Sequence, residues 1–208
     1  MTALRIPLFP LDVVLFPGAA LPLHIFELRY KLMIRRCVEK KLEFGVVLNR
    51  EGGIAAVGCT AAIVQMARTY PDGKMDILTE GRSACQVLEV FEDKPYLEAN
   101  VEILTDEIEA APGAEKETAE LEDLFSRCHE LIFGERAERI QRQSPQPLSF
   151  QIAGKLPLES ADRQEILEMR RESERRSHLL LRLHEWIPQL EQTQRMRKKA
   201  GGNGHGRA

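Results

Sequence analysis

The sequence is short of aromatic residues and of net charge. Aromatic side chains make up 6% of the 208 residues, with a single tryptophan, and the formal net charge is −3. Proteins that bind nucleic acid usually present a basic surface with aromatic residues among the cations, on which bases stack. The composition therefore gives no reason to expect a nucleic-acid partner.

Long apolar runs are also missing. No stretch approaches the ~20 apolar residues that a membrane helix needs, and the opening MTALRIPLFPLDVV lacks a basic head before an uninterrupted apolar core. We therefore expect neither a membrane partner nor a secretory signal. With 43% hydrophobic and 29% charged residues, the chain has the composition of a globular protein, which we expect in the cytoplasm.

Cysteine and histidine patterns that hold metals are absent. The four cysteines, at positions 37, 59, 85 and 128, form no CxxC pair, and each is predicted to be a buried, reduced thiol. His24 and Glu27 are three residues apart, but no HExxH motif exists. The sequence predicts no metal site and no cofactor.

Catalytic motifs are missing too. No GxxxxGK[ST] loop is present, and no serine lies in a GxSxG turn. A general acid or base needs a second placed group, and the sequence nominates none. We therefore predict that the chain is not an enzyme.

The most informative stretch that is present runs from Ile6 to Cys37. Its first half carries four prolines among apolar residues, which excludes a helix there and predicts short strand pieces such as Val13–Phe16 between turns. From Glu27 onward, apolar residues recur at three- and four-residue steps, which predicts one early helix. Its apolar face comprises Tyr30, Met33, Ile34, Cys37 and Val38.

Short apolar or alternating segments follow, which predict strands. One pair, 60–70 and 74–79, is separated by Pro71-Asp72-Gly73 and is predicted to be a hairpin. Other strands are predicted over 44–49, 85–91 and 96–104. Residues 1–105 are thus expected to form a compact, barrel-like β domain.

The second half has helical spacing. Residues 106–113 are acidic and interrupted by Pro-Gly, as in a linker, and 115–133 carry apolar residues at helical spacing. A long charged helix is predicted from Ser160, kinked or ended by Pro188. Residues 106–194 are therefore expected to form a small helical bundle, and the basic, glycine-rich residues 195–208 a disordered tail.

The run PLFPLDVVLFPGAALPLHIFELRY resembles the opening signature of the Lon protease amino-terminal domain family. Shorter matches follow in the same order: Phe44-Gly45-Val46-Val47, Glu80-Gly81 and Pro95-Tyr96-Leu97, then weaker ones at 149–153 and 156–158. The resemblance implies an α+β fold, a PUA-like β pseudo-barrel with one early helix followed by a small helical bundle. Two departures are Leu28, where many members have proline, and Ala84-Cys85-Gln86, where Arg-Phe-Arg is more usual.

The resemblance also implies a function. Such domains recognise unfolded or tagged substrates, and the chain has neither the phosphate-binding loop nor the serine–lysine pair of a complete Lon-type protease. We therefore predict a stand-alone, non-catalytic module that binds unfolded or partly folded proteins or peptides, with a separate protease or chaperone as a further candidate partner. The alternative is an RNA-binding PUA-like protein.

Four residues are candidates for the binding site. Phe26, Arg29 and Tyr30 are of types enriched at binding hot spots and lie where the proline-bounded segment enters the helix. In the alternative interpretation, Phe26 and Tyr30 are core residues and Arg29 is a surface cation. Arg82, beside Gly81 on a predicted loop, is either a fourth binding residue or an ordinary exposed turn residue.

Overall fold

The computed structural model describes residues 4–107, 114–138 and 140–202. Their contacts divide the chain into two compact units. The β unit holds Met1–Glu107 together with Ala153–Arg170, and the helical unit holds Ile108–Ile152 with Arg171–Ala208. Residues 153–170, predicted as part of the helical bundle, lie in the same compact unit as the strands.

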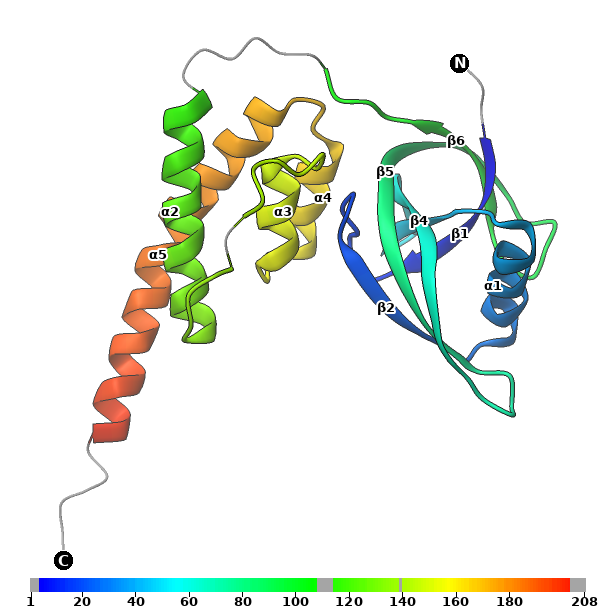
Figure 1. Ribbon diagram of the computed structural model, residues 1–208, viewed down its shortest axis with the longest axis horizontal. Helices are drawn as coiled ribbons and strands as arrows, with labels where there is room; N and C mark the ends of the chain where they lie inside the picture. The colour runs from blue at the N-terminus through cyan, green and yellow to red at the C-terminus, as the bar shows by residue number, and fades with distance from the viewer. Residues whose placement is uncertain (1–3, 108–113, 139, 203–208) are drawn as a thin grey trace, which may run out of the picture. The chain divides into compact units, whose positions relative to one another are not determined.

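The β unit is built on one six-stranded sheet in the order β2-β5-β4-β3-β1-β6, in which β6 pairs with β5 as well as with β1. The pairing of β1 with β3 is parallel and the other pairings are antiparallel, so the sheet is mixed. Because β6 returns to β5, the sheet curls on itself (Figure 1). This confirms the predicted α+β class and its barrel-like sheet. The strands are β1 (Leu4–Leu11), β2 (Ala20–Ile25), β3 (Phe44–Arg50), β4 (Gly53–Thr69), β5 (Met75–Phe91) and β6 (Glu98–Ile103).

The proline-rich opening differs from the prediction. β1 is continuous through Pro7 and Pro10, whereas Val13–Phe16, predicted as a strand piece, is irregular. Val14, Leu15 and Phe16 are nevertheless buried, because the segment lies in the core without pairing in the sheet. The predicted turn after Phe16 is present, and it is tied to β5 by the Gly18 N–H, which donates to the Gly81 carbonyl (2.8 Å).

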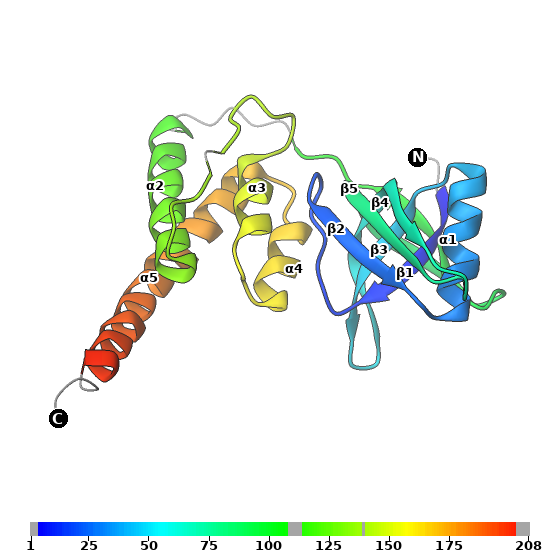
Figure 2. The ribbon, with the colours of Figure 1, turned by 60° about the horizontal axis from the view of Figure 1, so that its bottom comes forward.

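Helix α1 (Leu28–Lys40) is the predicted early helix. Its buried face comprises Tyr30, Met33, Ile34 and Cys37, while Val38, predicted on that face, is exposed. The helix ends at Lys41, which adopts the left-handed conformation (φ 52°) and whose N–H bonds back to the last turn. Figures 1 and 2 show α1 beside the sheet, on the opposite side from β2.

The predicted hairpin is confirmed and is longer than expected, because β4 and β5 each span 17 residues. Gly58 and Gly81 lie within these strands and do not end them. Both glycines are required by close backbone approach: a Cβ on Gly58 would lie 2.5 Å from the Val46 carbonyl oxygen, and one on Gly81 would lie 2.2 Å from the Phe16 carbonyl oxygen. Register shifts within the β4–β5 pairing mark bulges.

The helices after the sheet are α2 (Ala114–Phe133), α3 (Leu148–Lys155), α4 (Ser160–Glu168) and α5 (Glu172–Gly202). The single long helix predicted from Ser160 is therefore two helices, separated where Met169 becomes extended (ψ 139°). α5 continues past Pro188, so this proline does not end it. It also includes residues 195–202, the first part of the predicted disordered tail. Residues 203–208 of that tail and 108–113 of the predicted linker lie outside the described residues.

Arg175 joins α3 to α5 inside the helical unit. Its side chain is fully buried and its Nε donates to Ser149 Oγ (2.9 Å), while its guanidinium lies over the Phe150 ring (4.3 Å). Glu172 neutralises it at 3.1 Å. A buried cation is retained only with such partners, so this group orders the interior of the helical unit.

Candidate functional site

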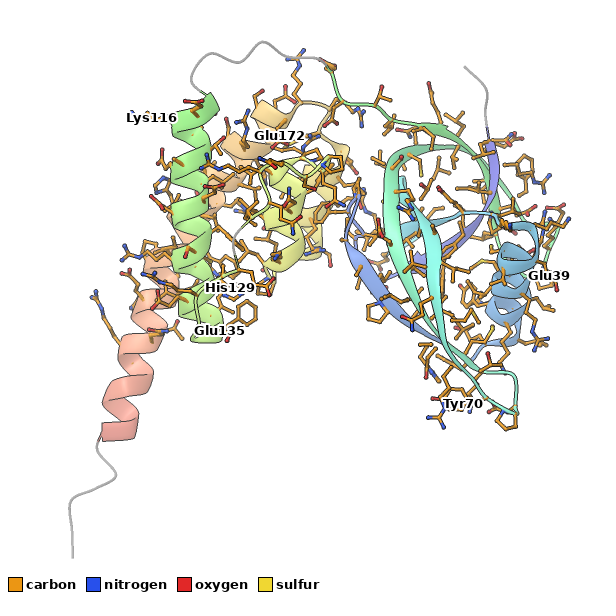
Figure 3. All side chains as sticks on the ribbon, in the orientation of Figure 1. Glu39, Tyr70, Lys116, His129, Glu135 and Glu172 are labelled. Atoms are coloured by element: carbon orange, nitrogen blue, oxygen red, sulfur yellow. The ribbon has the colours of Figure 1, made fainter. Side chains whose placement is uncertain are left out.

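Large apolar side chains are exposed where the chain enters α1. Phe26 is 58% exposed, Leu28 73% and Leu32 42%. Leu28 and Leu32 are four residues apart and lie on the face of α1 opposite its buried residues, the same outer side on which Figure 3 shows Glu39. We call Phe26, Leu28 and Leu32 the α1 N-terminal patch. Grouped apolar exposure of this kind is typical of a surface that binds something.

The predicted residues at this end of α1 divide into exposed and buried. Tyr30 is buried, and its ring centroid lies 4.1 Å from that of Phe9, so it belongs to the core. Burial raises the pKa of its hydroxyl. Arg29 is exposed, stacks over the Tyr30 ring (4.6 Å) and donates to Glu27 (2.9 Å). Phe26 and Arg29 are thus accessible to a partner, while Tyr30 supports Arg29 from beneath.

A hydrogen-bonded cluster that the sequence did not reveal lies beside Phe26. His24 Nδ1 and Asp76 Oδ1 are 2.6 Å apart, and the Tyr70 hydroxyl donates to Asp76 Oδ2 (2.7 Å). These hydrogen bonds from His24 and Tyr70 lower the pKa of Asp76. The cluster forms because β2 pairs with β5 in a register that sets His24 opposite Asp76. No local spacing signals a partner 52 residues away.

The cluster orients Phe26. The rings of His24 and Phe26 are nearly parallel (23°) with centroids 6.1 Å apart, and Tyr70 approaches His24 edge-on at 6.1 Å. Tyr70 lies at the end of the β4–β5 hairpin (Figure 3). Fixed rings reduce the conformational entropy that a contact residue loses on binding, so the cluster favours Phe26 as a contact residue.

A groove of about 580 Å³ lies between the end of α1 and β4. We call it the α1–β4 groove. Its apolar lining comprises Val38 and Leu42 on the helix side with Ile63, Val64 and Met66 on β4. Cys37 is also in the lining, and burial raises the pKa of its thiol to about 11, so it stays protonated. The groove thus combines an apolar lining with the charged residues Lys41, Glu43 and Arg82.

Arg82, the fourth predicted residue, lines this groove and not the α1 N-terminal patch. It donates to Glu80 at 2.9 Å and is exposed. The groove is at the carboxyl end of α1, and a helix of 13 residues is about 20 Å long. The structure therefore brings Phe26, Arg29 and Tyr30 together and places Arg82 at the other end of the helix.

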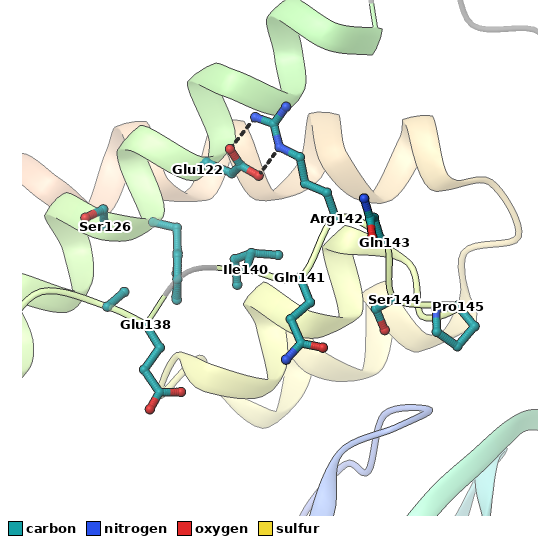
Figure 4. Close-up of a pocket in the computed structure, with 11 residues that line it drawn as sticks. Glu122, Ser126, Glu138, Ile140, Gln141, Arg142, Gln143, Ser144 and Pro145 are labelled. Atoms are coloured by element: carbon teal, nitrogen blue, oxygen red, sulfur yellow. Dashed lines mark hydrogen bonds and ion pairs between the residues drawn. The ribbon is translucent and has the colours of Figure 1, made fainter.

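The helical unit has a larger cavity, of about 830 Å³ (Figure 4). Arg142 pairs with Glu122 at its edge through a bidentate contact (Nε to Oε1, 2.8 Å). Phe125, Ala137 and Ile140 give it an apolar wall. Arg142 and Glu122 neutralise each other, and Glu138 is the third charged residue of the lining.

The chain matches a family of known domains. The model of the ATP-dependent protease La (LON) substrate-binding domain matches residues 5–185. A Lon protease of Parabacteroides distasonis is 29% identical over 86% of this chain, and the Lon protease of Escherichia coli K12 is 25% identical over 94% of it. The matching stretch is 24% of the first protease and 26% of the second, so the chain spans about a quarter of their length.

Solved structures support the same assignment. A Lon N-terminal domain protein from Xanthomonas campestris has a TM-score of 0.65 and 25% identity, covering 86% of this chain and 98% of that one. The N-terminal domain of a Mycobacterium avium complex Lon protease has the same fold (TM-score 0.65, 19% identity), covering 88% of this chain and 98% of that one. Separately, within the part of the chain that the structure describes, no helix is both long and apolar enough to cross a membrane.

Proposed function

Because this chain belongs to the family of the ATP-dependent protease La (LON) substrate-binding domain, we propose that it is a non-catalytic module that binds exposed or unfolded segments of other proteins. The observation that carries the proposal is the α1 N-terminal patch. Phe26 and Leu28 are more than half exposed beside the ordered His24–Tyr70 cluster. Unfolded chains differ from folded ones chiefly in exposing apolar side chains, which such a patch can cover.

The neighbouring charges suit this role. Arg29 lies next to Phe26 and is held by Glu27 and Tyr30. An arginine over an aromatic ring, beside an exposed aromatic residue, resembles the composition of binding hot spots. Tyr30 contributes as the buried support of Arg29, and Arg82 contributes at the groove.

We extend the proposal to the fate of the bound segment. The relatives are bacterial Lon proteases in which the matching stretch is about a quarter of the length. This supports a role in presenting bound segments to proteolysis, with a separate protease or chaperone as the partner.

The test is binding of a permanently unfolded probe, a reduced and carboxymethylated globular protein carrying a fluorophore. We expect the intact protein to raise the probe's anisotropy, and Phe26→Ala/Leu28→Ala to weaken the affinity at least about tenfold, since each lost apolar contact contributes roughly 1 kcal/mol or more. Leu181→Ala is the control, because Leu181 is equally exposed (59%) but lies on α5.

Two results would contradict the proposal. One is equal affinity of the intact protein and the Phe26/Leu28 variant at matched thermal stability, which would make these residues bystanders. The other is tighter binding of a single-stranded RNA than of the unfolded probe, with strong salt dependence, which would favour the alternative RNA-binding function.

A further inference from the structure

One side of β4 is unpaired over Ala62–Thr69. β4 pairs with β3 only as far as Ala61, which lies opposite Phe44, and beyond that residue it pairs with β5 alone. Among the strands that the structure describes, none takes the other side of this stretch. The backbone N–H and C=O groups on that side are therefore open to an added strand.

No proline interrupts this edge, although register shifts between Ile63 and Gln65 and between Met66 and Arg68 mark bulges in it, and Arg68 adds one charge. β2 is also an edge strand, but Pro22 at its centre has no N–H to donate and limits pairing there. Ala62–Thr69 contains no proline, and its exposed residues include Val64 (44%) and Met66 (39%). An exposed sheet edge is where an extended peptide can be added as a further strand, through main-chain hydrogen bonds and contacts of alternate side chains.

The α1–β4 groove lies along this edge and limits what can enter. Val38 and Leu42 on one side and Val64 and Met66 on the other form its apolar walls. Near the hairpin end, Lys31 Nζ donates to the Asp72 carbonyl (3.0 Å), which ties α1 to the hairpin tip. A space of about 580 Å³ beside a fixed helix suits a few residues of one strand rather than the sheet edge of a second copy of the chain.

The charges at the groove add a preference. Lys41 and Arg82 lie in its lining with one acid, Glu43. Arg82 is paired with Glu80, while Lys41 is exposed and has no ion pair among the described residues. A segment with a carboxylate at one end would pair with Lys41.

We propose that the α1–β4 groove binds an extended polypeptide segment as an additional strand on the Ala62–Thr69 edge. The segment carries apolar side chains at alternate positions, because alternate side chains of a strand point to the same face, and an acidic residue opposite Lys41. This inference rests on the proposed function and adds a second site with its own mode of recognition, through backbone hydrogen bonds.

The test uses a labelled peptide, acetyl-Glu-Val-Thr-Val-Thr-Val-amide, and two analogues N-methylated at alternate residues in the two possible phases. An added strand donates from one edge only, so we expect one analogue to bind like the parent and the other at least about tenfold more weakly. Val64→Lys/Met66→Lys in the protein should weaken the parent peptide by a similar factor. Leu88→Lys, at an exposed site on β5 (53%) outside the groove, should leave the affinity for the parent peptide unchanged.

Bound peptide should also slow hydrogen exchange at amides within 62–69. Equal binding of both analogues, full binding by the Val64/Met66 variant, or no binding of the parent peptide by the intact protein would overturn the inference. The unfolded-protein probe separates the two proposals. If that probe still binds through Phe26 and Leu28, only the strand-addition site fails; if it does not bind at all, the proposed function fails.

Discussion

Glu98 shows how one buried side chain can hold several elements of the β unit together. The residue is 1% exposed, yet three cations contact its carboxylate: Arg5 from β1 (2.9 Å), Lys94 (2.7 Å) and Arg36 from α1. Arg36 also donates to the Tyr96 hydroxyl (3.0 Å). Burial alone would raise the pKa of Glu98, but hydrogen bonds from Lys94 and Arg36 outweigh it, and the pKa is lowered.

Replacing the Glu98 carboxylate should destabilise the fold. We expect Glu98→Gln to lower the free energy of unfolding by about 3 kcal/mol, because three cations lose their shared counter-ion. Chemical denaturation at neutral pH measures this. The control is Glu89→Gln on the neighbouring strand, where the carboxylate accepts one exposed hydrogen bond from Asn100 (3.1 Å), and we expect a change within about 0.5 kcal/mol. Equal effects of the two substitutions would contradict the role given to Glu98.

The lowered pKa of Glu98 also sets a pH dependence. A carboxyl whose pKa is lower in the folded than in the unfolded protein stabilises the fold above its ordinary pKa, here 4.5, and this stability is lost as the pH falls through the folded value. The wild-type protein should therefore lose stability on acidification below about pH 5, and Glu98→Gln should lose less over the same range. Parallel pH profiles of the two proteins would show that other carboxyl groups dominate.

Gly81 lies where the backbone leaves no space for a side chain. A Cβ there would lie 2.2 Å from the Phe16 carbonyl oxygen, which is backbone and cannot rotate away. We expect Gly81→Ala to destabilise the protein by about 2 kcal/mol or more. Gly154→Ala is the matched control: its Cβ would meet Ala19 at an ordinary 3.9 Å within α3, and alanine should stabilise a helix by roughly 0.5–1 kcal/mol. Melting temperatures should thus shift in opposite directions.

At the scale of single residues, periodicity predicted burial well within α1 but not for residues outside the helix. Periodicity correctly assigned Met33, Ile34 and Cys37 to the buried face of α1. Phe26 and Tyr30 looked equivalent in sequence, yet one is exposed and the other buried, because Phe26 precedes the helix and is not on its apolar face. The His24–Asp76 contact depends on the strand register and had no sequence signal.

Arg163 operates at the scale of a whole element. It lies on α4, and its guanidinium donates to the carbonyls of Ala153 (2.9 Å), Leu156 (3.3 Å) and Val14 (3.0 Å). It also lies over the Phe16 ring (4.8 Å). Burial lowers its pKa. One side chain thereby joins α4 to the irregular segment after β1, which explains how 153–170 comes to share a compact unit with the strands.

Removal of Arg163 should loosen α4. We expect Arg163→Met to cost about 3 kcal/mol, since buried carbonyls lose their donors, and to speed hydrogen exchange most within α4. Arg50→Ala is the control: Arg50 makes an exposed ion pair with Glu168 on the same helix at 3.8 Å, which contributes roughly 0–1 kcal/mol. Unchanged exchange in α4 of the Arg163 variant would mean that apolar packing alone holds the helix.

Element boundaries were predicted well where turn chemistry was local. The Pro71-Asp72-Gly73 turn and the start of α1 agree with the structure. The sequence did not predict the break between α4 and α5, because Met169, Arg170 and Arg171 are all compatible with a helix. The break is instead fixed by the tertiary contacts of Arg170. The Arg170 carbonyl accepts from the Glu107 N–H (2.9 Å), and its guanidinium contacts the Thr105 carbonyl. Such contacts far along the chain are invisible to periodicity.

At the scale of the whole molecule, the reactivity of the four cysteines can report on the unfolding of each of the two units. Cys37, Cys59 and Cys85 belong to the β unit and Cys128 to the helical unit, and all four are free and buried. Burial raises the pKa of Cys37 and Cys128 to about 11 and that of Cys85 to about 12, and also raises that of Cys59. The thiolate is the reactive form. Each thiol is therefore protected twice: it stays protonated, and it is buried away from reagents.

We therefore expect the cysteines of the native protein not to react with a thiol reagent. At pH 8, a thiol with a pKa of about 11 is ionised about one part in a thousand, so we expect no stoichiometric reaction with a chromogenic disulfide reagent, and reaction of all four cysteines in concentrated guanidinium chloride. At intermediate denaturant, mass spectrometry should find Cys37, Cys59 and Cys85 labelled together and Cys128 labelled at its own rate, since each unit has its own core and opens locally. A single rate for all four would mean that the two units unfold as one cooperative body, and any recognition of unfolded segments by the β unit would then depend on the stability of both.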